Sequence, residues 1–103
     1  MRNDVLTLVK KTYVKDDYGV QREQTTERSV YCDVESITQK EFFAAENAGI
    51  RAAFRFDVFA YDYDGETEVI YNGGRYSIYR TYQKFNDILE LYAERKTADN
   101  GTD

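Results

Sequence analysis

The fold is decided by residues 50–61, which read IRAAFRFDVFAY. Every second side chain from Ile50 to Ala60 is apolar, while Arg51, Arg55 and Asp57 occupy alternate positions. Alternation with a period of two places successive side chains on opposite faces of a β-strand. The segment therefore predicts a half-buried antiparallel strand at the centre of the core.

Turn residues divide the rest of the C-terminal half into strands. Asp62-Tyr63-Asp64-Gly65 predicts one turn. Asn72-Gly73-Gly74 predicts a tight hairpin, because Asn-Gly adopts the positive φ angles of a type I′ turn. A third turn is expected over residues 84–87. The strands expected between these turns cover residues 66–71, 75–82 and 88–95. A helix over 85–96 is the alternative for the last segment, because Leu, Glu and Ala favour helices.

Two more strands are predicted on the N-terminal side. The first covers residues 4–14 and is followed by turn residues at 15–19. The second covers residues 28–37 and turns Val30, Cys32 and Val34 inward, so Cys32 is interpreted as a small core residue. Residues 21–27 between them have no apolar anchors, and we expect an exposed, mobile loop there.

A short helix is predicted between the second strand and the central one. Thr38 and Glu41 have the spacing of a capping box. In this motif the side chain of the N-cap residue, here Thr38, accepts a bond from the backbone N–H three residues later, and the side chain of that later residue, here Glu41, accepts a bond from the backbone N–H of the N-cap residue. Gly49 can end the helix in the left-handed conformation. The helix should therefore cover about residues 39–48, and it is too short to be stable unless it docks on the strands.

Together these elements predict a mainly β protein. We expect a small antiparallel barrel or sandwich of six strands with one inserted helix. The chain of 103 residues has the length of one domain, placed at residues 1–96. The polar residues 97–103 are expected to form a disordered tail.

Composition argues against several functions. The chain has no histidine and one cysteine, so it cannot build a zinc or iron site from these ligands or a histidine-based catalytic triad. The net charge of −5 argues against non-specific binding of nucleic acid, which depends on basic residues. No signal peptide or spanning apolar run is present, so an intracellular protein without a membrane segment is expected. We predict no enzyme activity, no cofactor and no metal.

Carboxylates are the remaining candidates for chemistry. The stretch Asp62–Glu66 resembles part of a calcium loop, but it lacks the spacing and helices of an EF-hand. Glu66 and Glu68 fall on one face of a strand and are interpreted as a solvated face. Arg51 and Arg55 also share a face. We expect a solvated face or ion pairs across strands with residues such as these glutamates, and the alternative is contact with an acidic partner or a phosphate. The tyrosines around the second hairpin indicate partner binding, because tyrosine concentrates at interfaces.

Three stretches carry a resemblance to a known family. The first is YCDVESI at 31–37, followed by TQKEFFAA at 38–45. The second is AFRFDV at 53–58, and the third is VIYNGGRYSI at 69–78. In their order and spacing these stretches resemble the head–tail adaptor proteins, also called head-closure or head–tail joining proteins, of long-tailed bacteriophages and prophages.

The resemblance implies a structural role in the virion neck, after assembly in the bacterial cytoplasm. Such proteins join as a ring beneath the portal and its adaptor after DNA packaging, close the head and present a surface for the tail. The implied partners are the portal-side adaptor, a tail protein and further copies of the chain, which is a monomer when free. Alternatives are a tail-completion or other neck protein, or a small ligand-binding barrel. The candidate partner-interface residues are Asp16, Asp17, Tyr18, Gln21, Arg22, Arg51, Arg55, Asp62, Tyr63, Asp64, Tyr71 and Tyr76.

Overall fold

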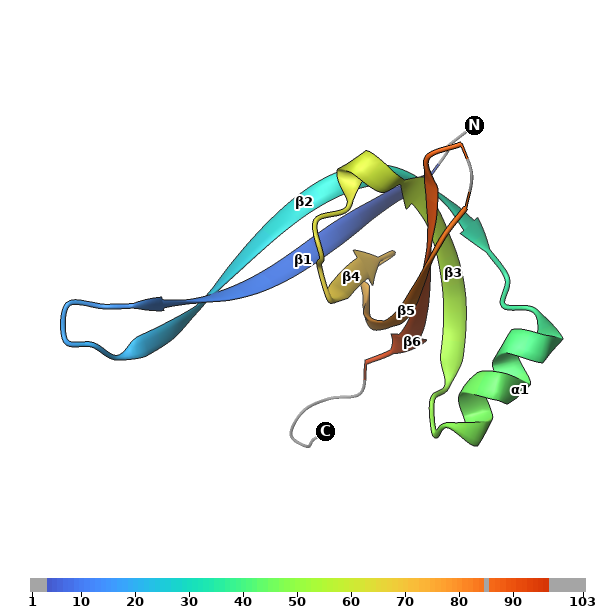
Figure 1. Ribbon diagram of the computed structural model, residues 1–103, viewed down its shortest axis with the longest axis horizontal. Helices are drawn as coiled ribbons and strands as arrows, with labels where there is room; N and C mark the ends of the chain where they lie inside the picture. The colour runs from blue at the N-terminus through green and yellow to red at the C-terminus, as the bar shows by residue number, and fades with distance from the viewer. Residues whose placement is uncertain (1–3, 85, 97–103) are drawn as a thin grey trace.

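Six antiparallel strands close into a barrel in the computed structural model, which describes residues 4–84 and 86–96 (Figure 1). Their order around the barrel is β1-β2-β3-β6-β5-β4. The prediction of a mainly β protein is confirmed. Of the two expected architectures, barrel and sandwich, the structure has the barrel. The strands are β1 (Asp4–Lys15), β2 (Gln21–Glu35), β3 (Ala52–Phe59), β4 (Glu68–Tyr71), β5 (Gly74–Gln83) and β6 (Ile88–Arg95). Helix α1 (Gln39–Asn47) follows β2, and the short 3-10 turn η1 (Ala60–Asp62) follows β3.

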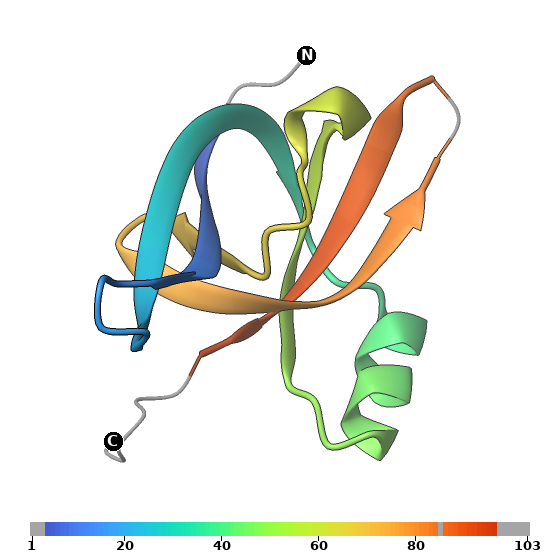
Figure 2. The same cartoon turned by 60° about the vertical axis from the view of Figure 1, so that its left-hand side comes forward.

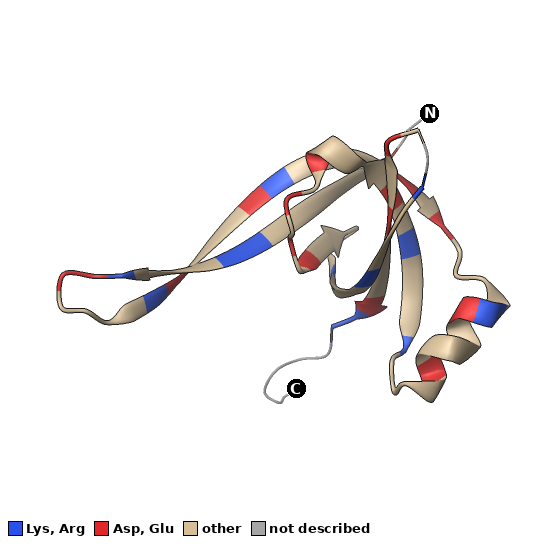
Figure 3. Cartoon of the chain, in the orientation of Figure 1, with Lys and Arg blue, Asp and Glu red and all other residues tan. Residues whose placement is uncertain are grey.

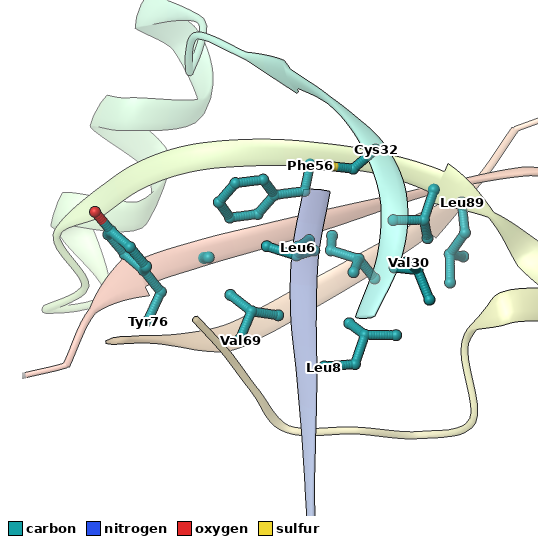
Figure 4. Close-up of a cluster of buried hydrophobic side chains, with 11 residues drawn as sticks. Leu6, Leu8, Val30, Cys32, Phe56, Val69, Tyr76 and Leu89 are labelled. Carbon is teal, nitrogen blue, oxygen red and sulfur yellow. The ribbon is translucent and has the colours of Figure 1, made fainter. Parts of the chain in front are cut away.

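Apolar side chains from every strand fill the barrel (Figure 4). Phe56 is fully buried at the middle of β3, as the alternating pattern predicted. Its ring and that of Phe54 contact the rings of Tyr71 and Tyr76 at centroid distances of 5.3–6.2 Å. Cys32 is fully buried in the same cluster, which confirms its interpretation as a core residue.

Helix α1 forms where the capping pattern placed it, and its last residue is Asn47 rather than Ala48. The hydroxyl of Thr38 accepts a hydrogen bond from the backbone N–H of Glu41 at 3.2 Å, which satisfies one donor of the first turn. Gly49 follows with φ +79°, the left-handed conformation that ends many helices. The helix lies beside the barrel, whose wall is formed by the six strands (Figure 2).

The second hairpin has the predicted turn. Asn72 and Gly73 have φ angles of 49° and 80°, as a type I′ turn requires. The two tyrosines beside the turn do not face each other across the strands, because the register pairs Tyr71 with Gly74 and Tyr76 with Val69. The last segment is strand β6, so the helical alternative over 85–96 is wrong in the part described.

The main correction concerns residues 21–27, which are not a mobile loop. They form the first half of β2 and pair with β1 residue by residue. A strand needs apolar side chains only where one of its faces is buried, and this part of β2 is exposed on both faces. The strand predicted over 50–61 is shorter at both ends, and the one predicted from residue 66 begins at Glu68.

Among the residues described, no helix is long and apolar enough to cross a membrane. The disordered tail predicted over residues 97–103 lies outside the described residues.

Candidate functional site

A long hairpin projects from the barrel and is the most prominent surface feature (Figure 1). Strands β1 and β2 pair over twelve positions, from Asp4 opposite Cys32 to Lys15 opposite Gln21. On its other side β1 pairs with β4 only over Thr7–Val9. The distal part, Lys10–Thr26, is therefore a two-stranded ribbon without a third strand among the described residues. We call Lys10–Thr26 the arm.

The tip of the arm is held by one carboxylate. Asp16 accepts hydrogen bonds at 2.9 Å from the backbone N–H groups of Tyr18 and Val20 and from the guanidinium of Arg22. The bond from Arg22, followed by the backbone bond from Val20, lowers the pKa of Asp16. These bonds fix the turn chemistry that the sequence predicted and keep the tip in one conformation.

On one face, the base of the arm is braced by the loop between β3 and β4. Arg28 donates to the Glu66 carboxylate at 2.8 Å and to the backbone carbonyl of Asp62. Lys10 forms an ion pair with Asp64 at 2.9 Å. Glu66 also accepts from the backbone N–H of Asp64 at 2.7 Å. This loop, predicted as a contact for other proteins, supports the arm of its own chain.

On the opposite face, Glu68 braces the arm. Its carboxylate pairs with Lys11 at 3.2 Å, with Arg75 at 3.0 Å and with Lys96. Glu68 is only 6% exposed and Glu66 only 2% exposed, so the interpretation of these glutamates as a solvated face is wrong. Cations from distant parts of the chain cover both carboxylates, and local sequence patterns do not show that.

These braces predict a loss of stability in acid. Burial alone would raise the pKa of both glutamates. The hydrogen bond from Arg28 instead holds the pKa of Glu66 below its ordinary value of 4.5. Hydrogen bonds from Lys96 and Lys11 do the same for Glu68. A depressed pKa gives stability that is present above 4.5 and lost as the pH falls through the folded value.

We therefore expect the free energy of unfolding to fall as the pH is lowered below about 4.5. Urea unfolding followed by fluorescence from about pH 7 to about pH 3 measures this. A Glu68→Gln variant should be less stable at neutral pH and lose less on acidification. Stability that stays level or increases in acid would contradict the assignment.

The brace at Glu66 has its own expected result. Glu66→Ala removes the acceptor for Arg28 and Asp64, and we expect a loss of about 2 kcal/mol, the scale of charged hydrogen bonds. Hydrogen exchange should show faster exchange of arm amides than in the parent chain. Glu27→Ala, at an exposed position on the same hairpin, is the matched control and should leave both measurements unchanged. Equal exchange in the two variants would show that the brace does not hold the arm.

The other candidate interface residues are dispersed. Arg55 pairs with Asp57 at 2.9 Å and with Glu90 at 3.5 Å, so its partners are not the glutamates considered from the sequence. Arg51 is exposed and precedes β3. Tyr76 is 6% exposed, and both it and Tyr71 pack against the core, so a surface role is wrong for Tyr76.

The structure does bring one group of candidates together. Asp16, Asp17, Tyr18, Gln21 and Arg22 all lie at the tip of the arm. Sequence reasoning missed their apolar neighbours, which are Tyr13, Val14 and Val20, at 63%, 46% and 53% exposed. The signal was the length of the first strand, because a strand that extends to residue 14 before a tight turn needs a partner of equal length.

The arm carries charges of both signs (Figure 3). Residues 10–26 include four basic and three acidic side chains. A surface that grips nucleic acid is predominantly basic, because its lysines and arginines neutralise phosphates. Mixed charge with exposed aromatic and aliphatic side chains is instead typical of a surface that binds protein.

A second surface feature lies between α1 and β5. It is an open hollow of about 280 Å³. Tyr79 and Arg80 of β5 both bind the carboxylate of Glu41, at 2.8 and 2.6 Å, and thereby attach the helix to the barrel. Burial and this bond to Glu41 raise the pKa of Tyr79, which keeps its hydroxyl protonated. The lining residues are Glu41, Ala44, Ala45, Ala48, Ile50, Tyr79 and Arg80.

No metal-binding cluster of three or more His, Cys, Asp or Glu side chains occurs within the described part of the chain. At the calcium-like stretch, Lys10 and Arg28 already neutralise Asp64 and Glu66. No model of a known protein family matches the chain, and no curated protein sequence matches it either.

Proposed function

We propose that this protein is a non-enzymatic connector of a phage or prophage neck, which adds as a ring to the portal and its adaptor after DNA packaging. In this role it closes the head and gives the tail its attachment surface. The proposal rests on the resemblance in sequence and on one structural observation, the braced arm.

The arm supports the proposal because it is exposed, ordered at its tip and fixed at its base. Exposed apolar side chains on a projecting element cost solubility and offer nothing to the core, so they are typical of a binding surface. Ion pairs on both faces of the base, at Glu66 and Glu68, hold the arm in one direction. A preorganised contact loses less conformational entropy on binding than a mobile loop does.

The filled barrel favours a connector over a small ligand-binding barrel. Phe56, Leu6, Leu8 and Leu91 are fully buried in its interior. The hollow beside α1 lies outside the barrel, between the helix and β5. A tail-completion or other neck protein remains the second candidate, because an arm that binds protein suits either position in the neck.

The test is assembly on the purified portal–adaptor complex. We expect light scattering to show a monomer for the free chain, and electron microscopy to show an added ring after mixing. A chain that stays monomeric and leaves an intact complex unchanged would overturn the head-closure assignment. Addition to purified tails instead would favour the tail-completion alternative.

A further inference from the structure

Two exposed apolar features lie at opposite ends of the molecule. The tip of the arm is at one end of the long axis, which measures 49 Å, and α1 with its hollow is at the other (Figure 1). Because the arm is braced away from the helix, the two features cannot meet within one copy. An apolar projection and an apolar recess on different parts of one molecule can meet only between two copies, in a head-to-tail arrangement.

The tip has the shape of a narrow wedge that carries exposed apolar side chains. Val14 lies opposite Arg22, and the bond from the backbone N–H of Asp16 to the carbonyl of Val20 continues that register by one pair. Val14 and Val20 therefore lie on the same face of the ribbon, together with Asp16 and Arg22, whose charges pair with each other at 2.9 Å. Tyr18, 91% exposed, stands in the turn between them.

The hollow is suited to side chains rather than to a small molecule. Its volume of about 280 Å³ is just below the range of about 300–1,000 Å³ of ordinary ligand pockets. Small side chains, such as Ala44 and Ala48, form the helical wall and leave room for a ring or a branched chain. The two charged residues that line the hollow, Glu41 and Arg80, form an ion pair at 2.6 Å. An apolar side chain in the hollow would therefore face a neutralised pair and not an isolated charge.

Charge also fits the two features to each other. The last turn of α1 has no basic residue, and Glu46 lies within it. The C-terminus of a helix carries partial negative charge, so this end of the hollow favours a cation. The arm provides one in Lys15, which is exposed on the opposite face of the ribbon from Val14 and Val20.

We propose that the arm tip of one copy docks in the hollow beside α1 of a second copy of this chain. The contact is heterologous, so each copy uses its arm toward one neighbour and its hollow toward the other. Repetition of such a contact closes a ring when the rotation between copies permits. The inference rests on the proposed function for its setting, because it assigns the contact between neighbours in the proposed ring.

Cysteine pairs provide the test. Tyr18→Cys and Ala44→Cys are made in separately tagged chains, which are mixed and oxidised both free in solution and on the portal–adaptor complex. Cys32 is fully buried and does not compete. The control pairs Tyr18→Cys with Phe43→Cys, which is exposed on α1 but does not line the hollow. We expect roughly tenfold more mixed dimer with Ala44→Cys, because docking raises the effective concentration of the two thiols.

Equal yields from the two pairs would overturn the inference, and so would a disulfide from Tyr18→Cys to the portal adaptor in place of the second copy. The two proposals fail separately. A ring on the portal complex without the mixed dimer would reject the docking contact and retain the connector role. A mixed dimer in free solution without a ring on the portal complex would retain the contact and reject the role.

A second pair of variants checks that the contact runs in one direction. Ala44→Arg fills the hollow from an exposed helical position, and Tyr18→Ser with Val20→Ser removes the apolar tip. Each should fail to form rings alone, and their mixture should give dimers that extend no further. Rings formed by either variant alone would contradict the assignment of its surface.

Discussion

Phe56→Ala should destabilise the protein by about 3–5 kcal/mol, the cost of removing a large aromatic side chain from a packed core. Phe56 is fully buried, and its ring contacts that of Phe54 on the same strand and those of Tyr71 and Tyr76 on two other strands. The substitution removes contacts across the barrel and leaves a cavity that backbone on all sides keeps from collapsing. Urea unfolding at neutral pH measures the loss.

The matched control for this prediction is Phe43→Ala. Phe43 is 54% exposed on α1, so removal of its ring should change the free energy of unfolding by less than about 0.5 kcal/mol. Similar losses from the two substitutions would show that Phe56 is not at the centre of the core.

Shortening the arm should abolish ring formation and leave the barrel folded. Residues 13–23 are replaced by Asn-Gly, which joins Thr12 to its cross-strand partner Gln24 through a two-residue turn. The removed residues, apart from the half-buried Asp16, are exposed, and the braces at Glu66 and Glu68 remain. We expect the free energy of unfolding to change by no more than about 1 kcal/mol, because nearly all the removed side chains make their contacts with water.

The measurement is electron microscopy of the portal–adaptor complex after mixing, with sedimentation to quantify bound chains. The control is Glu27→Ala, which keeps the arm at full length and should assemble as the parent chain does. A complete ring formed by the shortened chain would show that the arm is not the assembly surface. A chain that unfolds at much lower urea concentration would show that the arm also supports the barrel.

The sequence was most informative where one face of a strand is buried. The alternation around Phe56 and the Asn72-Gly73 turn each depend on local chemistry, so strand, face and turn type could be predicted from neighbouring residues. The same alternation favoured a strand over a helix for the last segment. Leu89, Leu91 and Ala93 of β6 all lie in the core.

Prediction failed where the deciding partner is remote in the chain. Residues 21–27 have no apolar pattern, because their stability as a strand comes from pairing with β1 rather than from burial. Glu68 is buried by Lys11 and Lys96, which lie 57 residues before it and 28 residues after it. The candidate site was therefore found in part, at the arm tip, while the braces that direct the arm came only from the fold.

The position of β6 has a consequence for synthesis of the protein. This last strand inserts between β3 and β5, which occur earlier in the chain. Until residues 88–95 leave the ribosome, both of those strands have an unpaired edge, and the barrel cannot close. The β1–β2 hairpin needs only local contacts and can form early, whereas closure must wait for nearly complete translation. Nascent chains that stall before β6 therefore expose strand edges to one another and are the form most prone to aggregate.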